Sequence, residues 1–207
     1  LKSYQSIDNV FVKSICDLNE KRLKEIGKKY EVENLFLDYN SITEDHEIDL
    51  VSICSYDNFH FEQLISCLKN GKHVMVEKPV VLHPHEAEIV VKELDKTNLK
   101  ISSNLILRQS PRFIKIKDLV EKGHFGDIFH IEGDYIHNIL WKLTHGWRGK
   151  MDFYCTVYGG GIHLIDLMRW IMNSEIKEVN SIGTSILTKN SMYKWNDTIT
   201  SIFKWNN

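Results

Sequence analysis

The stretch Gly71–Pro79, which reads G-K-H-V-M-V-E-K-P, constrains the fold of this chain more than any other. Within it, His73–Val76 is a short apolar run with β-branched residues that ends directly in a carboxylate, an ammonium group and a proline. Gly71 suits the left-handed position just past a helix end, so a helix is expected to lead into this strand. Glu77 and Lys78 then lie at the carboxyl end of a buried strand, where open α/β sheets bind ligands. The alternative is a surface Glu-Lys pair beside a turn proline.

Strand and helix patterns alternate around this stretch, with short links between them. The predicted strands are Phe11–Cys16, Leu35–Leu37, Leu50–Cys54, His73–Val76 and Lys100–Ser103, and the predicted helices are Asn19–Tyr30, Phe59–Asn70 and Pro84–Thr97. Leu1–Ser6 reads as the last turns of one more helix. Five alternations predict an α/β fold with a doubly wound parallel sheet and right-handed crossovers.

The pattern changes after Arg108. The predicted elements there are helices at Pro111–Glu121 and Ile162–Met172, the second opened by Gly159–Gly161, and strands at Ile128–Tyr135, Val179–Leu187 and Thr198–Trp205. Longer strands and fewer crossovers predict a second α+β domain with a mostly antiparallel or mixed open sheet. We therefore divide the chain into residues 1–107 and residues 108–207.

Composition excludes several classes of protein. The 207 residues are 43% hydrophobic and 26% charged with a formal net charge of −2, as in an ordinary soluble globular protein. No charge imbalance indicates a nucleic-acid or membrane partner, and no apolar run approaches membrane-spanning length. The four cysteines are far apart and none has metal-ligand spacing, so free thiols in a reducing cytoplasm and no metal site are expected.

Three stretches, in order along the chain, resemble the glucose-fructose oxidoreductase / inositol dehydrogenase family, often called Gfo/Idh/MocA. Leu50–His60 is similar to that family's apolar strand and T-P-N-x-x-H turn, and Gly71–Pro79 to its A-G-K-H-V-x-x-E-K-P segment. Gly159–Asp166 is similar to the G-G-G…H-x-x-D stretch of its second domain. The resemblance covers essentially the whole chain and implies a Rossmann-like domain that binds NAD(P) at residues 1–107, followed by a substrate and oligomerisation domain at residues 108–207.

The chain departs from the family pattern at several positions. Tyr56 and Asp57 stand where the family usually has Pro and Asn, and Gly159 stands where many members have an Asp four residues before the histidine. A Lys-Asp-His triad therefore cannot be carried over whole. No G-x-G-x-x-G occurs in the sequence, and the alignment places that loop and its strand upstream of Leu1. We expect the chain to be truncated at both ends.

Cofactor-binding residues are expected at the carboxyl ends of the sheet strands. Asp17 can accept hydrogen bonds from the adenosine ribose hydroxyls and would repel a 2′-phosphate, which favours NAD; capping of the helix at Asn19 is its alternative role. Arg22 keeps NADP possible, because Arg can pair with a phosphate. The other expected cofactor contacts are Ser55, Asp57, His60, Glu77, Lys78 and Arg108. For His60, capping or packing of its own helix remains the alternative.

The resemblance implies that Lys78 reaches the substrate hydroxyl that becomes a carbonyl. A free Lys, with a pKa of about 10.4, is a poor base at neutral pH, and burial beside a positive nicotinamide would lower that pKa. Protonated Lys78 would instead polarise the carbonyl during reduction. Pro79 is a candidate cis-proline. His163 is the expected second proton-exchanging group, and Asp166 would fix its tautomer or bind a sugar hydroxyl, with a structural role as the alternative.

A cluster of aromatic and basic residues provides candidate substrate contacts at Trp141, His145, Trp147 and Arg148. Aromatic faces suit a sugar ring and Arg suits a carboxylate or phosphate, while loop packing is an equally open reading. We expect a cytoplasmic NAD(P)-dependent oxidoreductase that acts on a secondary alcohol of a sugar or polyol and forms a homodimer or homotetramer. An NAD-recycling glycosidase of the same fold and a non-catalytic sensor are the two rival hypotheses.

Overall fold

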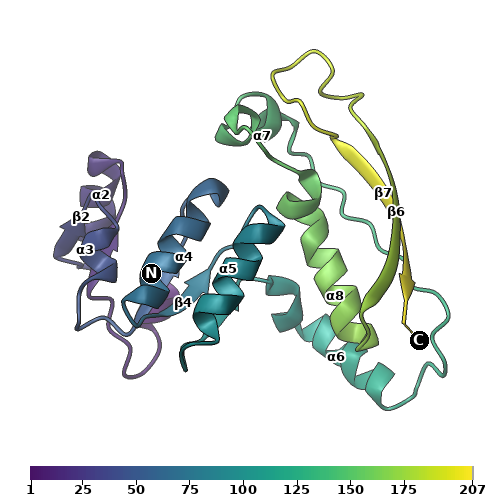
Figure 1. Ribbon diagram of the computed structural model, residues 1–207, viewed down its shortest axis with the longest axis horizontal. Coiled ribbons are helices and arrows are strands. Elements are labelled where there is room, and N and C mark those ends of the chain that lie inside the picture. The colour runs from purple at the N-terminus through teal and green to yellow at the C-terminus, as the bar shows by residue number, and fades with distance from the viewer. Residues whose placement is uncertain (207) are drawn as a thin grey trace. The chain divides into compact units, whose positions relative to one another are not determined.

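The computed structural model describes residues 1–206 and divides the chain into two compact units, residues 1–104 and residues from 105 onward (Figure 1). The assignment of residues 1–107 to cofactor binding and of residues 108–207 to substrate binding and oligomerisation stays a prediction.

The first unit alternates strands with helices, as predicted. Its elements are α1 (Lys2–Gln5), β1 (Ser14–Cys16), α2 (Glu20–Tyr30), β2 (Asn34–Phe36), α3 (Asn40–Thr43), β3 (Leu50–Ile53), η1 (Asp57–Phe59), α4 (His60–Lys69), β4 (His73–Val76), α5 (Pro84–Leu94) and β5 (Ile101–Ser103). Every strand pair in this unit is parallel, in the orders β1-β2 and β3-β4-β5. The predicted α/β class is thereby confirmed.

Several predicted strands are longer than the observed ones. The strand predicted from Phe11 begins only at Ser14, and Phe11 is 90% exposed. An apolar residue extends a strand only where a neighbouring strand supplies hydrogen-bond partners, and β1 pairs with β2 only from Ser14 to Cys16. The helix predicted to run to Thr97 ends at Leu94, and Asp95 is its C-cap residue.

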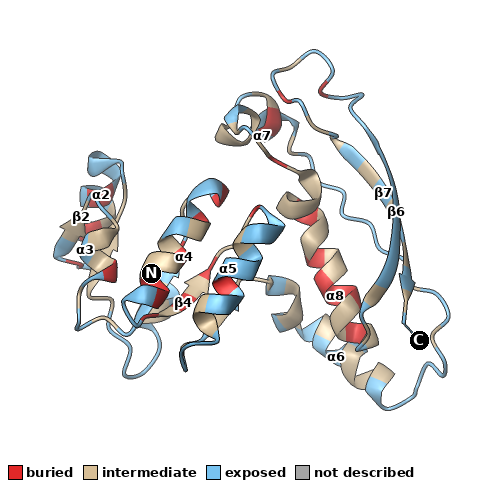
Figure 2. Cartoon of the chain, viewed as in Figure 1, coloured by how far each residue is buried: buried red, intermediate tan, exposed pale blue. Residues whose placement is uncertain are grey.

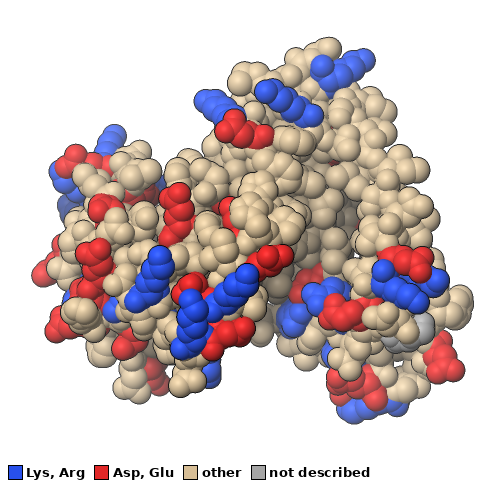
Figure 3. Space-filling model, viewed as in Figure 1, with Lys and Arg blue, Asp and Glu red and all other residues tan. Residues whose placement is uncertain are grey.

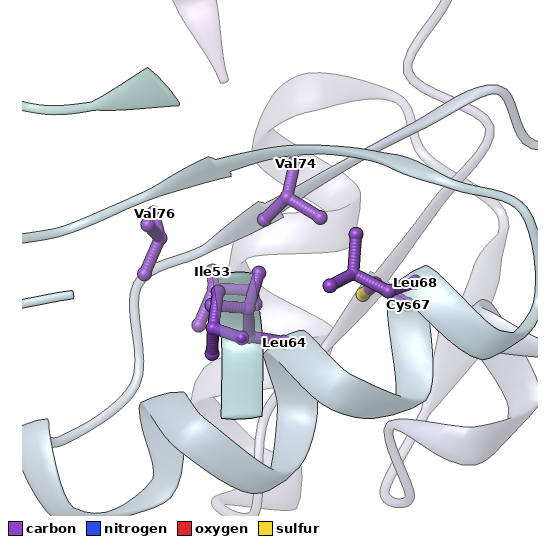
Figure 4. Packing of buried hydrophobic residues seen from close by; sticks show 7 residues of the cluster. Ile53, Leu64, Cys67, Leu68, Val74 and Val76 are labelled. Carbon is purple, nitrogen blue, oxygen red and sulfur yellow. The ribbon is translucent and has the colours of Figure 1, made fainter. Parts of the chain in front are cut away.

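The core of the first unit lies between the sheet β3-β4-β5 and the helices α4 and α5. Leu64 and Cys67 from α4 are fully buried against Val74 and Val76 from β4, as Figure 4 shows. Burial of such side chains is worth about 1.5–3 kcal/mol each. Gly71 has a φ of +74° and ends the α4 segment, so the chain enters β4 as the sequence predicted.

The second unit combines helices with one antiparallel ribbon. Its elements are η2 (Ile106–Gln109), α6 (Pro111–Glu121), α7 (Leu140–Thr144), η3 (Trp147–Lys150), a π-helical turn η4 (Val157–Gly161), α8 (Ile162–Met172), β6 (Ile176–Thr184) and β7 (Thr198–Trp205). The ribbon pairs Thr184 with Thr198 and Val179 with Phe203. The predicted α+β character of this half is confirmed.

Of the strands predicted in the second unit, one is not formed and one is shifted along the chain. Residues 128–135 have no regular secondary structure, although their side chains alternate as in a strand. Alternation shows which face a strand would bury, but a strand also needs a paired neighbour, and none of the strands in residues 1–206 pairs with this segment. The strand predicted at Val179–Leu187 is observed at Ile176–Thr184, where β7 supplies the partners.

The ribbon exposes more of its surface than the sheet of the first unit. Eight of the nine β6 residues are exposed, among them Ile182 at 76%, whereas β4 has two buried and two half-buried residues (Figure 2). Basic and acidic side chains are interspersed on the face drawn in Figure 3. No helix within residues 1–206 has the length and apolar character that crossing a membrane requires.

Candidate functional site

The carboxyl ends of β3, β4 and β5 lie in register, because main-chain hydrogen bonds continue past the strands. The Glu77 amide donates to the Ile53 carbonyl at 2.9 Å, and the Asn104 amide donates to the Val76 carbonyl at 3.0 Å. Asn104 then donates through Nδ2 to Glu77 Oε1 at 2.7 Å. Glu77 is thus fixed at this edge of the sheet by its own amide and by the side chain of Asn104, which directly follows β5.

Lys78 and Pro79 follow Glu77 in the turn after β4. The Lys78–Pro79 peptide bond is cis, as the sequence predicted. Lys78 is half-buried and Val80, just beyond the turn, packs against the core of the unit. The charged pair therefore emerges from a turn that is anchored in the core, in contrast to a surface pair on a loose loop.

His60 ties this turn to the turn after β3. Its ring is fully buried, with Nδ1 facing the Pro79 carbonyl at 2.7 Å and Nε2 facing the Ser55 carbonyl at 3.2 Å. Both ring nitrogens therefore face main-chain carbonyls, and the nitrogen that carries the proton donates to its carbonyl. This arrangement supports the packing role that the sequence left open for His60, and a direct contact with a cofactor stays a prediction.

The other polar residues after β3 differ in exposure. The Ser55 hydroxyl donates to Gln63 Oε1 at 2.8 Å, so this side chain braces its own turn against α4. Asp57 begins η1 and is 8% exposed, whereas Tyr56 is 50% exposed. Their predicted contacts with a dinucleotide stay predictions.

Asp17 follows β1 and takes part in the start of α2. Its Oδ1 accepts from the Asn19 amide at 2.8 Å, and Asn19 in turn caps the helix by accepting from the Arg22 amide at 3.0 Å. Arg22 Nε lies 3.7 Å from Asp17 Oδ2, with the two side chains 71% and 37% exposed. Asn19, not Asp17, therefore caps the helix, and Asp17 supports the cap residue through its amide. The second oxygen of Asp17 and the Arg22 guanidinium lie together at the surface beyond the strand.

In the second unit, Arg108 and Asp166 form a bidentate ion pair. Arg108 Nε donates to Asp166 Oδ2 at 2.7 Å and Nη2 donates to Oδ1 at 2.5 Å, while the guanidinium lies 6.0 Å from the centre of the Trp170 ring. The hydrogen bond to Asp166 raises the pKa of Arg108 above its ordinary value. Both oxygens of the 7% exposed carboxylate are engaged, which supports the structural role left open for Asp166. Contacts of Arg108 with cofactor and of Asp166 with substrate stay predictions.

His163 lies in the first turn of α8 and is 7% exposed. The Tyr135 ring stacks on it with a centroid distance of 6.0 Å and an interplanar angle of 24°. A Cβ on Gly160 would lie 2.8 Å from two atoms of the Tyr135 ring. Gly160 therefore allows an aromatic ring to pack beside the histidine.

The four predicted substrate contacts separate into two pairs. Trp141 is 70% exposed and stacks with His145 at 6.5 Å, at the end of α7. The Arg148 guanidinium lies 4.3 Å from the Trp147 ring centre and 5.7 Å from that of Tyr154, which is 2% exposed. The second pair supports the loop-packing reading, and the first pair presents an aromatic face to solvent.

Sequence reasoning missed three residues that the structure places beside predicted ones. Asn104 holds Glu77, Tyr135 stacks on His163, and Tyr154 packs under Arg148. A signal existed for Asn104, because it is the polar residue directly after the strand Ile101–Ser103. No comparable local signal marks the two tyrosines, since both lie in irregular segments.

The thiols and the possible metal ligands add little to the site. All four cysteines are free, and burial raises the pKa of the Cys67 thiol to about 12, so this thiol is an inert part of the core. Within residues 1–206, no group of three or more His, Cys, Asp or Glu side chains is placed to hold a metal ion.

Comparison with protein families gives a match over both units. Residues 1–105 match a family model described as oxidoreductase family, NAD-binding Rossmann fold. Residues 113–207 match one described as GFO/IDH/MocA C-terminal domain.

Known proteins are similar along nearly the whole chain. A myo-inositol 2-dehydrogenase of Thermotoga maritima is 30% identical over 206 residues, which are 97% of this chain and 59% of that enzyme. Among solved structures, a probable dehydrogenase from Thermotoga maritima is 27% identical with a TM-score of 0.83, covering 99% of this chain and 61% of that one.

A scyllo-inositol dehydrogenase of Lactobacillus casei, solved with NAD(H) and scyllo-inositol, has the same fold, with a TM-score of 0.82 and 24% identity. The match covers 98% of this chain and 61% of that one. The chain thus spans about three fifths of the length of these relatives.

Proposed function

The chain belongs to the GFO/IDH/MocA family of oxidoreductases, and from this premise we propose that the protein transfers a hydride between NAD(P) and a secondary alcohol. The proposed substrate is a sugar, a polyol or a sugar derivative. The names of two similar proteins, a myo-inositol and a scyllo-inositol dehydrogenase, support this substrate class.

The observation that carries the proposal is the anchored turn Glu77-Lys78-Pro79 at the carboxyl edge of the parallel sheet. Asn104 engages one carboxylate oxygen of Glu77, which leaves Oε2 to accept from a ribose hydroxyl. The buried His60 ring makes a second side-chain contact with this turn, with Nδ1 at the Pro79 carbonyl. The edge thus combines an oriented acceptor with an adjacent ammonium group, which fits a nicotinamide riboside better than a phosphate.

A bound nicotinamide would accept or supply the hydride, and the chain's own residues would handle the proton. We propose that Lys78 Nζ takes the hydroxyl proton in oxidation and returns it in reduction, and that His163 exchanges a proton in the same reaction. Asp17 would accept from the adenosine ribose hydroxyls, which favours NAD, while Arg22 beside it would pair with the 2′-phosphate of NADP.

The proposal extends to the setting of the protein. Four free cysteines support a reducing compartment, and we propose a cytoplasmic location. The exposed apolar side chains of the ribbon β6–β7, such as Val179, Ile182 and Ile202, support an assembly into a homodimer or homotetramer.

The test is an assay of the full-length protein with NAD and with NADP against inositol isomers and simple sugars, following both reduced dinucleotide and sugar products. The Lys78→Ala variant should lose about a thousandfold in turnover while dinucleotide binding persists, because a proton acceptor is removed without changing the fold. Net formation of NADH with an oxidised sugar is the expected result.

Three other outcomes would contradict the proposal. Cleaved glycoside without net NADH would indicate the recycling glycosidase. Ligand binding without turnover across the panel would indicate a sensor. Near-normal turnover of Lys78→Ala would remove Lys78 from the mechanism, whichever substrate is found.

A further inference from the structure

Gly159 lies one helical turn before His163 on the same side of the helical segment. Gly159 lies in the π-helical turn η4 and His163 in the first turn of α8. Residues four apart in such a segment lie about one turn apart on the same face, so a side chain at position 159 would lie beside the histidine. The amide of Gly159 already donates to the Cys155 carbonyl at 3.0 Å, which fixes the glycine in this turn. Position 159 is therefore a place from which a polar group can act on His163.

Another residue already occupies the space next to Gly159. A Cβ built on this glycine would overlap the hydroxyl oxygen of Tyr154 and lie 2.8 Å from its Cζ. Gly161, two residues further on, offers a contrast, since a Cβ there would meet only the Val157 side chain at ordinary contact distances of 3.5–3.9 Å. The glycine at position 159 thus admits the tip of Tyr154.

The Tyr154 side chain is held firmly in this place. It is 2% exposed, and its ring has edge contacts with the rings of Trp147 and Tyr193 at centroid distances of 6.4 and 6.3 Å. The Arg148 guanidinium lies 5.7 Å from the ring centre, and the Tyr193 hydroxyl donates to the Tyr154 carbonyl at 3.4 Å. A buried aromatic ring with contacts on several sides fixes the position of its hydroxyl.

We propose that Tyr154 is a positioning residue for His163. The Tyr154 hydroxyl occupies the space that a side chain at position 159 would take. It supplies the hydrogen-bonding group on this face of the helix, because a phenol hydroxyl is able both to donate and to accept. Tyr135 stacks on the histidine ring with the ring centroids 6.0 Å apart, so the ring itself has an aromatic neighbour, while the Tyr154 hydroxyl lies beside Gly159, four residues before the histidine. The inference rests on the proposed function, in which His163 exchanges a proton with the substrate.

The experiment uses the full-length protein and four variants, of which Tyr154→Leu alone is the reference for thermal stability. Tyr154→Phe removes only the hydroxyl and should lower kcat about tenfold with little change in KM for the dinucleotide. Tyr154→Leu/Gly159→Asp frees the overlapping volume and supplies a carboxylate from position 159, so it should recover most of that loss. Tyr158→Phe removes a neighbouring hydroxyl outside this arrangement and serves as the matched control.

A second measurement does not depend on turnover. The long-range proton–nitrogen spectrum of the histidine rings, assigned with His163→Gln, reports the tautomer and hydrogen bonding of His163. Tyr154→Phe should move the His163 signals and Tyr158→Phe should leave them unchanged.

The outcomes separate this inference from the proposed function. Unchanged His163 signals together with a kcat within twofold of wild type in Tyr154→Phe would overturn the inference. Failure of the double variant to recover activity, with loss of thermal stability equal to that of Tyr154→Leu alone, would reduce Tyr154 to a packing residue and also overturn it. If the wild-type protein turns over nothing, the proposed function fails, and the histidine spectrum still decides the role of Tyr154.

Discussion

The two units fix their candidate functional residues in different ways. In the first unit, Glu77 and Asn104 are placed by main-chain hydrogen bonds that extend the parallel ladder beyond β4 and β5. In the second unit, Asp166 is held by Arg108, a side chain 58 residues away, and His163 is packed by a tyrosine from an irregular segment. Main-chain hydrogen bonds thus place the candidate residues of the first unit, whereas side-chain contacts place those of the second.

This difference predicts how each unit responds to change. A backbone-built edge depends on the core beneath the strands, so it should lose order only when that core is damaged. An arrangement of side chains depends on its individual pairs, so single polar substitutions should disturb it.

Leu64→Ala should destabilise the first unit by about 3 kcal/mol, because a fully buried side chain of α4 would leave a cavity against β4. Denaturant unfolding combined with hydrogen exchange resolved by peptide measures the effect in each unit. Ile89→Ala on α5, where the side chain is 39% exposed, is the control and should cost far less.

The contrast between the two units would be contradicted if Leu64→Ala lowered the protection of amides from hydrogen exchange by the same amount in both units. That result would mean that one cooperative core supports both sets of residues. Protection lost only in residues 1–104 would sharpen the contrast.

The sequence predicted the backbone-built edge well, and for a physical reason. Apolar runs such as Leu50–Cys54 and His73–Val76, separated by helices with short links, leave few alternatives to parallel pairing with right-handed crossovers. The polar residues after each run then lie at one edge. The cis bond before Pro79 and the left-handed Gly71 were also predictable, because few residue types adopt these conformations.

The side-chain arrangement of the second unit was not predictable in the same way. Arg108 and Asp166 were each identified as candidate site residues, but nothing in their local sequence shows that they pair with each other. Residues 128–135 alternate like a strand, yet Tyr135 instead lies in an irregular segment beside His163. Contacts between segments far apart in sequence follow from tertiary packing, which local pattern does not encode.

Asp166→Asn should destabilise the second unit by about 2 kcal/mol. The change keeps the shape of the side chain but leaves the Arg108 guanidinium without its counter-charge, and because Arg108 is 40% exposed, solvent makes the cost smaller than for a fully buried pair. Glu175→Gln removes the other bidentate pair of α8, to Arg169, where the carboxylate is 67% exposed, and should cost about 0.5 kcal/mol or less.

Thermal unfolding of the two variants measures this difference directly. Equal losses in Asp166→Asn and Glu175→Gln would show that the Arg108 pair is an ordinary surface ion pair. The second unit would then not depend on this contact, and the contrast with the first unit would weaken.

The smallest effect is expected from Lys13, whose ammonium pairs with Asp45 at 2.5 Å and with Glu47 at 2.6 Å in the first unit. The hydrogen bond from Lys13 holds the pKa of Asp45 below its ordinary value. The Lys13–Asp45 pair therefore stabilises the folded state fully at pH values above about 3.9, the pKa of Asp45 in the unfolded chain. This stabilisation is lost as the pH falls through the lower pKa that Asp45 has in the folded state.

Lys13→Met should accordingly unfold at a slightly lower temperature than wild type at neutral pH, and the difference should vanish at about pH 2. Thermal scans across this range, with Lys24→Met of the exposed Lys24–Glu20 pair as control, measure it. A loss at neutral pH as large as that of Asp166→Asn would mean that side-chain pairs carry the first unit too. Lys13 lies just before β1, so such a result would mean that the ion pair of Lys13 stabilises this strand. The first unit would then also depend on side-chain pairs, and the contrast between the two units would no longer hold.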